Sequence, residues 1–504
     1  MFDQGLKAMK VLFISAEAIP FAKMGGLADV AGSLPAALKR LGIDVFMGLP
    51  FYRSVREGNF ALRLLMDNLK VPFGAGKLVA RVWESKITEG IPVYLIERED
   101  MYDRPQIYGN SFGDYYDNFE RFAFFSRAIL SMLEELSMKP DLMHCHDWPT
   151  GLLPAMLKEP LRYSAAPGET PTVFTIHNVG YQGLFPADKL SISNLSRDEF
   201  FHPEGLEYYG NISLLKAGIV YSDAVTTVSP TYAREIQTPE YGMGMEGTLR
   251  HRQAFLWGIL NGVDYQLWDP ARDSLIPIQY SAGKLAGKQA CKESLLNEMK
   301  LDPFLAKKPL LGMITRLDAQ KGVDLLVKII DDLLALDAGL VVLGSGEERI
   351  QEALKEAVYS HAGRIGLTIG FDEQLAHRII AGADIFLNPS RYEPCGLTQM
   401  YALKYGTIPV VRATGGLEDT ITVFDPAKGT GTGFKFEPYD PESFLAAAQQ
   451  AVEIFQDNES WNKIIANAMN EDFSWDRSAG KYQELYQSVI EKKASSLKTS
   501  QSEA

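Results

Sequence analysis

The stretch KVLFISAEAIPFAKMGGLADVAGSLPAALKRLGIDVFM, residues 10–47, contains the first three elements of an α/β fold. Residues 11–14 are a short apolar run that predicts a buried strand. A glycine-containing loop follows at residues 23–26, and apolar residues then recur at helical spacing from Leu27 to Leu41. Residues 43–47 predict a second strand. A strand, a helix and a strand in this order are typical of a βαβ unit in a parallel sheet.

The same alternation continues along the chain. The rhythm breaks between about residues 235 and 277, so we predict two doubly wound, Rossmann-like domains at residues 1–250 and 251–490, with a cleft between them. A helix predicted at about residues 475–490 would cap either domain, and one arrangement packs it back on the first. The polar residues 491–504 are expected to be a disordered tail. Further strands are predicted at residues 93–96, 141–145, 172–176, 224–228, 310–314, 339–343, 365–369, 384–387 and 407–411.

The composition excludes several classes of function. Lys and Arg number 50 against 64 Asp and Glu, a formal net charge of −14, which argues against broad binding to nucleic acid or anionic membranes. The three cysteines, Cys145, Cys291 and Cys395, are far apart and odd in number, so no disulfide framework or CxxC metal site is expected. No apolar run resembles a signal peptide or a membrane span, and we expect a cytoplasmic protein.

The loop Lys23-Met24-Gly25-Gly26-Leu27 is the first candidate site. It follows a predicted strand and opens a helix, where ligands of doubly wound sheets bind. Glycines allow a ligand to approach the backbone, the helix N-terminus attracts anions, and Lys23 adds a positive charge. The loop therefore predicts either a phosphate-binding site or a tight turn with a surface lysine.

A second strand-to-helix loop lies at residues 315–322. Arg316 and Lys321 in this loop could converge on one diphosphate, where a charge-assisted hydrogen bond in a shielded site contributes roughly 1.5–3 kcal/mol. The alternative is a solvated helix start with Lys321 facing water.

The third such loop lies at residues 391–399. The backbone N–H groups of Gly396, Leu397 and Thr398 would open a helix, and Glu393 could accept hydrogen bonds from sugar hydroxyls or form a structural ion pair. The tetrapeptide Thr414-Gly415-Gly416-Leu417 repeats the Gly-Gly-Leu pattern, and packing alone could explain it.

Two other motifs are less informative. The run Gly344-Ser345-Gly346 lacks the third glycine of a dinucleotide fingerprint, because Arg349 stands there, so a tight turn is predicted. The run His144-Cys145-His146-Asp147-Trp148 has the composition of a metal cluster, but alternate strand residues face opposite sides and no distant ligands complete a tetrahedron. No metal and no cofactor are therefore expected. His177-Asn178 follows a predicted strand and is either a satisfied loop histidine or a ligand contact.

Taken together, these motifs resemble those of the bacterial glycogen synthases, in the ADP-glucose-dependent glycogen and starch synthase family. The likeness runs over about residues 10–490. It rests on residues 23–30, 144–148, 175–183, 261–264, 316–322, 393–399 and 414–417. The resemblance implies a GT-B fold and transfer of glucose from ADP-glucose to the nonreducing 4-hydroxyl of glycogen or a malto-oligosaccharide, with retention of configuration.

The resemblance also implies roles for individual residues. Lys23, Gly25 and Gly26, with Arg316 and Lys321, would hold the donor diphosphate. Glucose hydroxyls would be bound by Glu393 and the backbone of Cys395, Gly396 and Leu397, the phosphate by Thr398, and the opposite side of the sugar by Asn261 and His177. Asp147 would face the acceptor. In the family's proposed front-face mechanism, the leaving phosphate oxygen takes the acceptor proton.

Two departures and three alternatives limit these roles. Tyr401 stands where wider GT-B relatives often carry a second glutamate, so the ribose contacts stay unassigned. Phe371 stands where a tyrosine often lies over adenine, which keeps an aromatic face but loses a hydroxyl. The alternatives are the same fold with UDP-glucose, the same fold with another acceptor, and a noncatalytic glucan-binding relative. The sequence does not indicate the oligomeric state.

Overall fold

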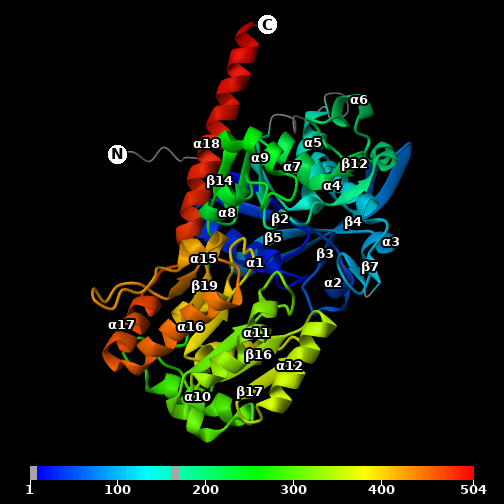
Figure 1. The fold of residues 1–504 in the computed structure, drawn as a ribbon. Coiled ribbons are helices and arrows are strands. Elements are labelled where there is room, and N and C mark those ends of the chain that lie inside the picture. The colour runs from blue at the N-terminus through cyan, green and yellow to red at the C-terminus, as the bar shows by residue number, and fades with distance from the viewer. Residues whose placement is uncertain (1–7, 111, 160–169, 504) are drawn as a thin grey trace, which may run out of the picture. The chain divides into compact units, whose positions relative to one another are not determined.

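The computed structural model describes residues 8–110, 112–159 and 170–503, and it is shown in Figure 1. The chain forms two compact units. The first comprises Met1–Val228, Ala233–Gly262 and Trp475–Ala504, and the second comprises Ser229–Tyr232 and Val263–Ser474. The main boundary thus falls twelve residues later than the predicted position after residue 250, because residues 251–262 still belong to the first unit.

The first unit is built on one large mixed sheet. Strands β1, β2, β5, β8, β9, β13 and β14 are parallel, and β4 and β3 extend the sheet as an antiparallel hairpin. Within the described residues the strand order is β14 (Leu256–Gly258), β13 (Ala224–Thr227), β9 (Thr172–Ile176), β8 (Leu142–His146), β1 (Lys10–Ile14), β2 (Asp44–Pro50), β5 (Ile91–Glu97), β4 (Gly76–Ile87) and β3 (Arg63–Phe73).

The order of the strands identifies where a ligand would bind in the first unit. Phe13 of β1 pairs with Met47 of β2 on one side and with His144 of β8 on the other. The chain therefore reverses its direction of winding at β1, and the loops after β1 and β8 leave the same edge of the sheet. Such a switch point is where ligands of open α/β sheets bind.

The helices of the first unit cover this sheet and connect its strands, and short strands among the described residues form two small additional sheets. They are α1 (Gly26–Arg40), α2 (Arg53–Glu57), α3 (Glu99–Tyr102), α4 (Asn118–Glu135), α5 (Leu152–Lys158), α6 (Arg197–Phe200), α7 (Leu214–Tyr221), α9 (Glu246–His251) and α18 (Trp475–Glu503), with β6 (Gly109–Asn110), β7 (Gly113–Asp114), β10 (Leu184–Pro186), β11 (Glu207–Tyr208) and β12 (Asn211–Ser213). The short helix α8 (Pro230–Glu235) contains residues of both units.

The second unit has a fully parallel sheet. In the described part of the chain its order is β17 (Ile365–Ile369), β16 (Gly339–Gly344), β15 (Leu310–Ile314), β18 (Ile385–Asn388), β19 (Ile408–Arg412) and β20 (Phe434–Phe436). This is the 3-2-1-4-5-6 order of dinucleotide-binding folds, with the switch point between β15 and β18. Its helices are α10 (Ala286–Glu298), α11 (Val323–Ala335), α12 (Glu348–Ser360), α13 (Glu373–Gly382), α14 (Thr398–Lys404), α15 (Gly415–Thr420), α16 (Pro441–Gln456) and α17 (Asn458–Met469).

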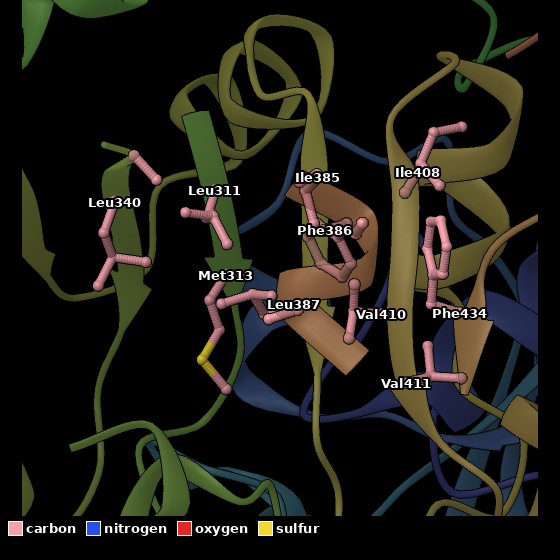
Figure 2. Close-up of a cluster of buried hydrophobic side chains, with 14 of the residues drawn as sticks. Leu311, Met313, Leu340, Ile385, Phe386, Leu387, Ile408, Val410, Val411 and Phe434 are labelled. Carbon is pink, nitrogen blue, oxygen red and sulfur yellow. The ribbon is translucent and has the colours of Figure 1, made fainter. Parts of the chain in front are cut away.

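The core of the second unit explains why its strands read as continuous apolar runs. Figure 2 shows Leu311, Leu340 and Phe386 among the side chains that pack together from neighbouring strands. Both faces of a parallel sheet are covered, so nearly every strand residue is apolar. Full burial of each such side chain contributes about 1.5–3 kcal/mol.

The last helix, α18, packs on the first unit through its early turns. Tyr482, Leu485 and Tyr486 are buried in the same core as Phe13 of β1. The helix continues through Glu503, where the sequence predicted a disordered tail from residue 491. Lys493 in this extension donates to Asp223 over 2.8 Å. Composition alone did not distinguish a solvated polar helix from disorder. No helix in the described ranges is both long and apolar enough to span a membrane.

Candidate functional site

The loop after β1 places Lys23 and its glycines beside the N-terminus of α1. Gly25 is the N-cap residue of α1, and Lys23 Nζ lies 2.8 Å from Asp29 Oδ1. A β-carbon added at Gly25 or Gly26 would meet no atom within 4 Å. Packing therefore does not require these glycines, and the backbone stays accessible to a ligand beside a positive helix end.

A buried carboxylate that the sequence analysis missed holds this loop in shape. Glu17 is 4% exposed, and its Oε2 accepts hydrogen bonds from the N–H groups of Met24 at 2.7 Å and Gly25 at 2.9 Å. Its Oε1 accepts from the hydroxyl of Tyr108 at 2.7 Å. Glu17 therefore binds two backbone N–H groups of the loop and fixes the position of the loop's remaining backbone. In the sequence, the only sign of this role is that Glu17 is a single acidic residue shortly after a predicted buried strand.

The ends of β8 and β9 bring two histidines together. His146 Nδ1 lies 3.0 Å from His177 Nε2, and His146 stacks on Phe13 with ring centroids 4.0 Å apart. His144 Nδ1 and Nε2 contact the hydroxyls of Tyr486 and Thr175. Both ring nitrogens of His144 and one of His146 are thus used within the protein. The rings of His144 and His146 pack together with centroids 4.0 Å apart, and the described residues contain no cluster of His, Cys, Asp or Glu that could hold a metal ion.

Asp147 lies at the end of β8, in a strained backbone conformation. Its φ is 55°, its Oδ1 accepts from the N–H of His177 at 2.7 Å, and it is 9% exposed. Burial raises the pKa of Asp147 to about 7, and the His177 N–H acts in the opposite direction. Burial lowers the pKa of His177 to about 3, so this ring is neutral at physiological pH. The site thus holds a neutral imidazole beside a carboxyl that titrates near neutrality.

Asn261 belongs to the first unit rather than to the predicted second domain. It is 6% exposed, and its Oδ1 has no hydrogen-bond partner among the described residues. The next residue, Gly262, packs directly on the backbone of Trp475, since an added β-carbon would lie 2.5 Å from Trp475 Cα. A buried amide oxygen without a partner is unfavourable unless a ligand or water satisfies it.

In the second unit, the loops after β15 and β18 bring Lys321 and Glu393 into contact. Lys321 Nζ lies 2.6 Å from Glu393 Oε2, and both side chains are largely buried, at 19% and 8% exposed. Ser390 Oγ donates to the same carboxylate oxygen at 3.1 Å. The sequence offered a ligand contact or an ion pair for Glu393, and the structure shows the ion pair. The Lys321–Glu393 ion pair thus lies at the switch point of this sheet.

Arg316 lies in the same loop as Lys321 but is more exposed. Its guanidinium contacts Gln320 Oε1 and Asp318 Oδ2, each at 2.8 Å, and its side chain is 53% exposed. Gly322 closes the loop with φ of 72°, and a β-carbon there would lie 2.1 Å from the carbonyl oxygen of Pro389. The loops after β15 and β18 are therefore packed backbone against backbone.

The loop after β18 continues into α14 through Cys395, Gly396, Leu397 and Thr398. Gly396 has φ of 69°, and Leu397 is the N-cap of α14, which begins at Thr398. The fully buried Gln399 donates to the carbonyl oxygens of Cys395 and Gly396, both at 3.0 Å. This amide locks the turn, so its backbone N–H groups have fixed directions.

Phe371 and Tyr401, which depart from the family pattern, also belong to the second unit. Phe371 follows β17 at the edge of the sheet, with its side chain 83% exposed. Tyr401 stacks on Trp268 with ring centroids 4.0 Å apart, and Trp268 stacks in turn on His377. Tyr401 thus packs in an aromatic stack of the second unit.

Comparisons with known proteins agree with this architecture. A model of the starch synthase catalytic domain matches residues 10–251, and a model of glycosyl transferases group 1 matches residues 298–470. The chain is 44% identical over 485 residues to a glycogen synthase of Syntrophotalea carbinolica, covering 96% of this chain and 99% of the relative. It is 45% identical over 494 residues to a glycogen synthase of Moorella thermoacetica, covering 97% and 99%.

A solved structure gives the same result. The catalytic domain of starch synthase IV from Arabidopsis thaliana, bound to ADP and acarbose, matches with a TM-score of 0.89 and 35% identity, over 96% of this chain and 100% of that one. The two Rossmann-like sheets and the matched domains define a GT-B glycosyltransferase. More particularly, the chain belongs to the bacterial glycogen synthase family, and its function is that of a glycogen synthase.

Proposed function

We propose that this enzyme transfers glucose from ADP-glucose to the nonreducing 4-hydroxyl of an α-1,4-glucan with retention of configuration. The observation that carries the proposal is the buried Lys321–Glu393 pair at the switch point of the second sheet. In this pair Lys321 supplies a cation for a phosphate, and Glu393 beside it supplies an acceptor for sugar hydroxyls. The ADP and acarbose bound to the related starch synthase support the choice of donor and acceptor classes.

The positive charge for the leaving diphosphate comes from both units. Lys23, with the open backbone of Gly25 and Gly26, supplies it from the first unit, and Arg316 and Lys321 supply it from the second. Negative charge builds on the phosphate as its bond to glucose C1 breaks, so these groups act more strongly in the transition state than in the ground state. The chain is acidic overall, and such a local cluster is what a dianionic leaving group needs.

The glucosyl group is bound by polar atoms with fixed directions. Glu393 accepts from its hydroxyls, the backbone of Cys395, Gly396 and Leu397 lies against it, and Thr398 binds the adjacent phosphate. From the first unit, His177 and the partnerless Oδ1 of Asn261 contact the sugar. The side chain of Phe371 stacks on adenine.

Asp147 faces the acceptor and orders His177 through the backbone. The acceptor hydroxyl loses its proton to the departing phosphate oxygen as its own oxygen bonds to C1, on the same face that the phosphate leaves. No carboxylate nucleophile is then required, and the positions of Asp147 and Glu393 serve binding.

His146 acts as a positioning residue for His177. Its Nε2 is buried without a partner among the described residues. An orphaned N–H is less favourable than an orphaned acceptor, so the proton of His146 is on Nδ1 and donates to His177 Nε2. His177 then carries its own proton on Nδ1, where it donates to a sugar oxygen.

The test is an incorporation assay with purified protein, glycogen and labelled ADP-glucose or UDP-glucose. We expect transfer from ADP-glucose, and glycosidase digestion should release the label from α-1,4 linkages. Preference for UDP-glucose would overturn the donor assignment. Incorporation from neither donor would falsify the enzymatic proposal and favour a glucan-binding role.

A further inference from the structure

A strained tyrosine stands at the tip of the hairpin formed by β11 and β12 in the first unit. Tyr208 pairs with Asn211, which leaves Tyr209 and Gly210 as a two-residue loop. Their φ angles are 47° and 81°. Positive φ at both positions is the type I′ turn, which strongly favours Asn-Gly. This chain has a bulky aromatic residue where asparagine would be favoured.

Packing does not compensate for this strain. The side chain of Tyr209 is 81% exposed. Its ring contacts that of Tyr208, edge to face, with centroids 4.8 Å apart. A left-handed conformation is unfavourable for a non-glycine residue, and burial offsets little of this at Tyr209. Strain that packing does not offset is a reason to look for a function.

Neighbouring segments place further apolar groups next to this hairpin. The hydroxyl of Tyr208 donates to the carbonyl oxygen of Met243 at 3.2 Å, and Gln182 Nε2 donates to the same oxygen at 2.8 Å. Met243 also has a positive φ, of 50°, and is 40% exposed. Tyr181, beside Gln182, is 54% exposed. We call Tyr208, Tyr209 and Met243 the tyrosine platform.

We propose that the tyrosine platform is a binding site for the α-glucan polymer, separate from the residues that hold the donor. Aromatic rings bind sugars through the C–H faces of the pyranose, and their hydroxyls add hydrogen bonds. The three platform side chains carry no charge, which suits a neutral polymer. Glu207, the residue before Tyr208, is already used, because it accepts from the N–H of Gly210 at 2.7 Å.

The position of the platform in the chain favours glucan over another occupant. Gln182, which joins the platform segments, lies in the loop that begins directly after His177. The platform therefore extends from the loop that we assign to the sugar-binding side. This inference rests on the proposed function for its ligand. A second contact with a long acceptor would raise its effective concentration at the reacting end.

The experiment replaces Tyr209 with asparagine, which removes the ring and restores the favoured Asn-Gly turn. Glycogen affinity is measured by electrophoresis through gels containing glycogen, which needs no donor. We expect Tyr209→Asn to weaken glycogen binding about 3- to 10-fold, the loss expected for one stacking aromatic group. The KM for ADP-glucose and kcat at saturating glycogen should not change, and the melting temperature should rise.

Two variants serve as controls. Tyr209→Phe keeps the stacking face and should bind glycogen like the parent protein. Tyr359→Asn removes an equally exposed tyrosine, at 89%, from α12 of the second unit, and should not affect glycogen binding.

Other outcomes contradict the proposal. Unchanged glycogen binding in Tyr209→Asn would overturn it, and so would a lower melting temperature, which would assign the ring a structural role. A change in sedimentation coefficient with unchanged glycogen binding would identify a second copy of the chain as the occupant. Weaker binding by the variant in a protein without transferase activity would support the platform and reject the proposed function.

Discussion

The tripeptide Gly-Gly-Leu opens a helix in each unit, for opposite physical reasons. At Gly25 and Gly26 an added β-carbon meets no atom within 4 Å. At Gly415 it would lie 1.9 Å from the carbonyl oxygen of Glu393, and at Gly416 it would lie 2.0 Å from that of Cys395. The first pair of glycines leaves the backbone open, whereas the second lets two loops pack in contact.

The same contrast holds for the two lysines. Lys321 is held by Glu393 in a largely buried pair, whereas Lys23 is 43% exposed and pairs with Asp29. The groups that we assign to phosphate and sugar in the second unit are therefore paired and largely buried, whereas the first unit offers an open loop shaped by Glu17. Substitutions that affect only one of the two loops test this difference in burial and pairing.

The largest effect is expected from Lys321→Ala. Loss of the Lys321 side chain removes a cation from beside the negative charge that develops on the phosphate. Turnover should therefore fall roughly 100- to 1,000-fold while glycogen binding persists. Initial rates with saturating glycogen and glycogen-gel electrophoresis measure the two properties. Lys435→Ala is the matched control, because the Lys435 side chain is similarly shielded, at 16% exposed, and pairs with Glu418 in the same unit. An equal loss of turnover in both variants would contradict the assignment.

Alanine at the two glycine pairs should separate activity from stability. Gly26→Ala should fold normally but lose up to about 100-fold in turnover, because a methyl group displaces the phosphate by about 1 Å. Gly416→Ala should instead destabilise the protein by about 3 kcal/mol through overpacking. Thermal melting and initial rates distinguish the two. The comparison fails if Gly26→Ala melts early or Gly416→Ala is as stable as the parent protein.

The sequence predicted much of the fold, because buried parallel strands are apolar and short. It also placed the candidate site in the loops after these strands, since ligands of doubly wound sheets bind there, and that assignment stays a prediction. It did not distinguish the two Gly-Gly-Leu motifs, because the difference is the distance of each to the rest of the chain. Gly416 is constrained by the carbonyl of Cys395, a contact that no local pattern reveals.

A smaller effect is expected at His146, whose Nδ1 lies 3.0 Å from His177 Nε2. Asn places an N–H donor close to the position of imidazole Nδ1, whereas Leu of similar shape does not. We therefore expect His146→Leu to lower kcat about 10-fold, the loss of one oriented hydrogen bond, and His146→Asn to recover most of it. The KM for ADP-glucose should change less than kcat. Equal rates in the two variants would reduce His146 to a packing role.

His144 is the control for this prediction. It lies on the same strand and face, but its nitrogens contact Tyr486 and Thr175 instead of His177. His144→Asn and His144→Leu should therefore not differ in kcat in the way that the His146 variants do.

The last predicted effect, on stability rather than turnover, is a pH dependence at Asp147. Burial raises its pKa to about 7 in the folded protein, above the unfolded value of 3.8. The folded state then binds more protons than the unfolded state between these values, so this contribution is complete at low pH and is lost as pH rises through 7. Asp147→Asn should gain stability relative to the parent between pH 4 and pH 8. Melting temperatures across this range would show a constant difference if the pKa were ordinary.

Glu17 and His146 show what the sequence could not reveal. Glu17 precedes the glycine loop by six residues, and only the fold shows that its carboxylate accepts from Met24 and Gly25. His146 looked like part of a metal-like cluster, but pairing with β9 turns it toward His177. Both residues act through a neighbour, and contacts of this kind depend on tertiary structure.

The most direct test is the affinity for ADP of Lys23→Ala and Lys321→Ala, measured by calorimetry. If one diphosphate is held from both units, each substitution weakens ADP binding about 10-fold or more, while glycogen binding in gels is unchanged. ADP binding unaltered by Lys23→Ala would contradict the account, because the open loop of the first unit would then have no part in holding the donor.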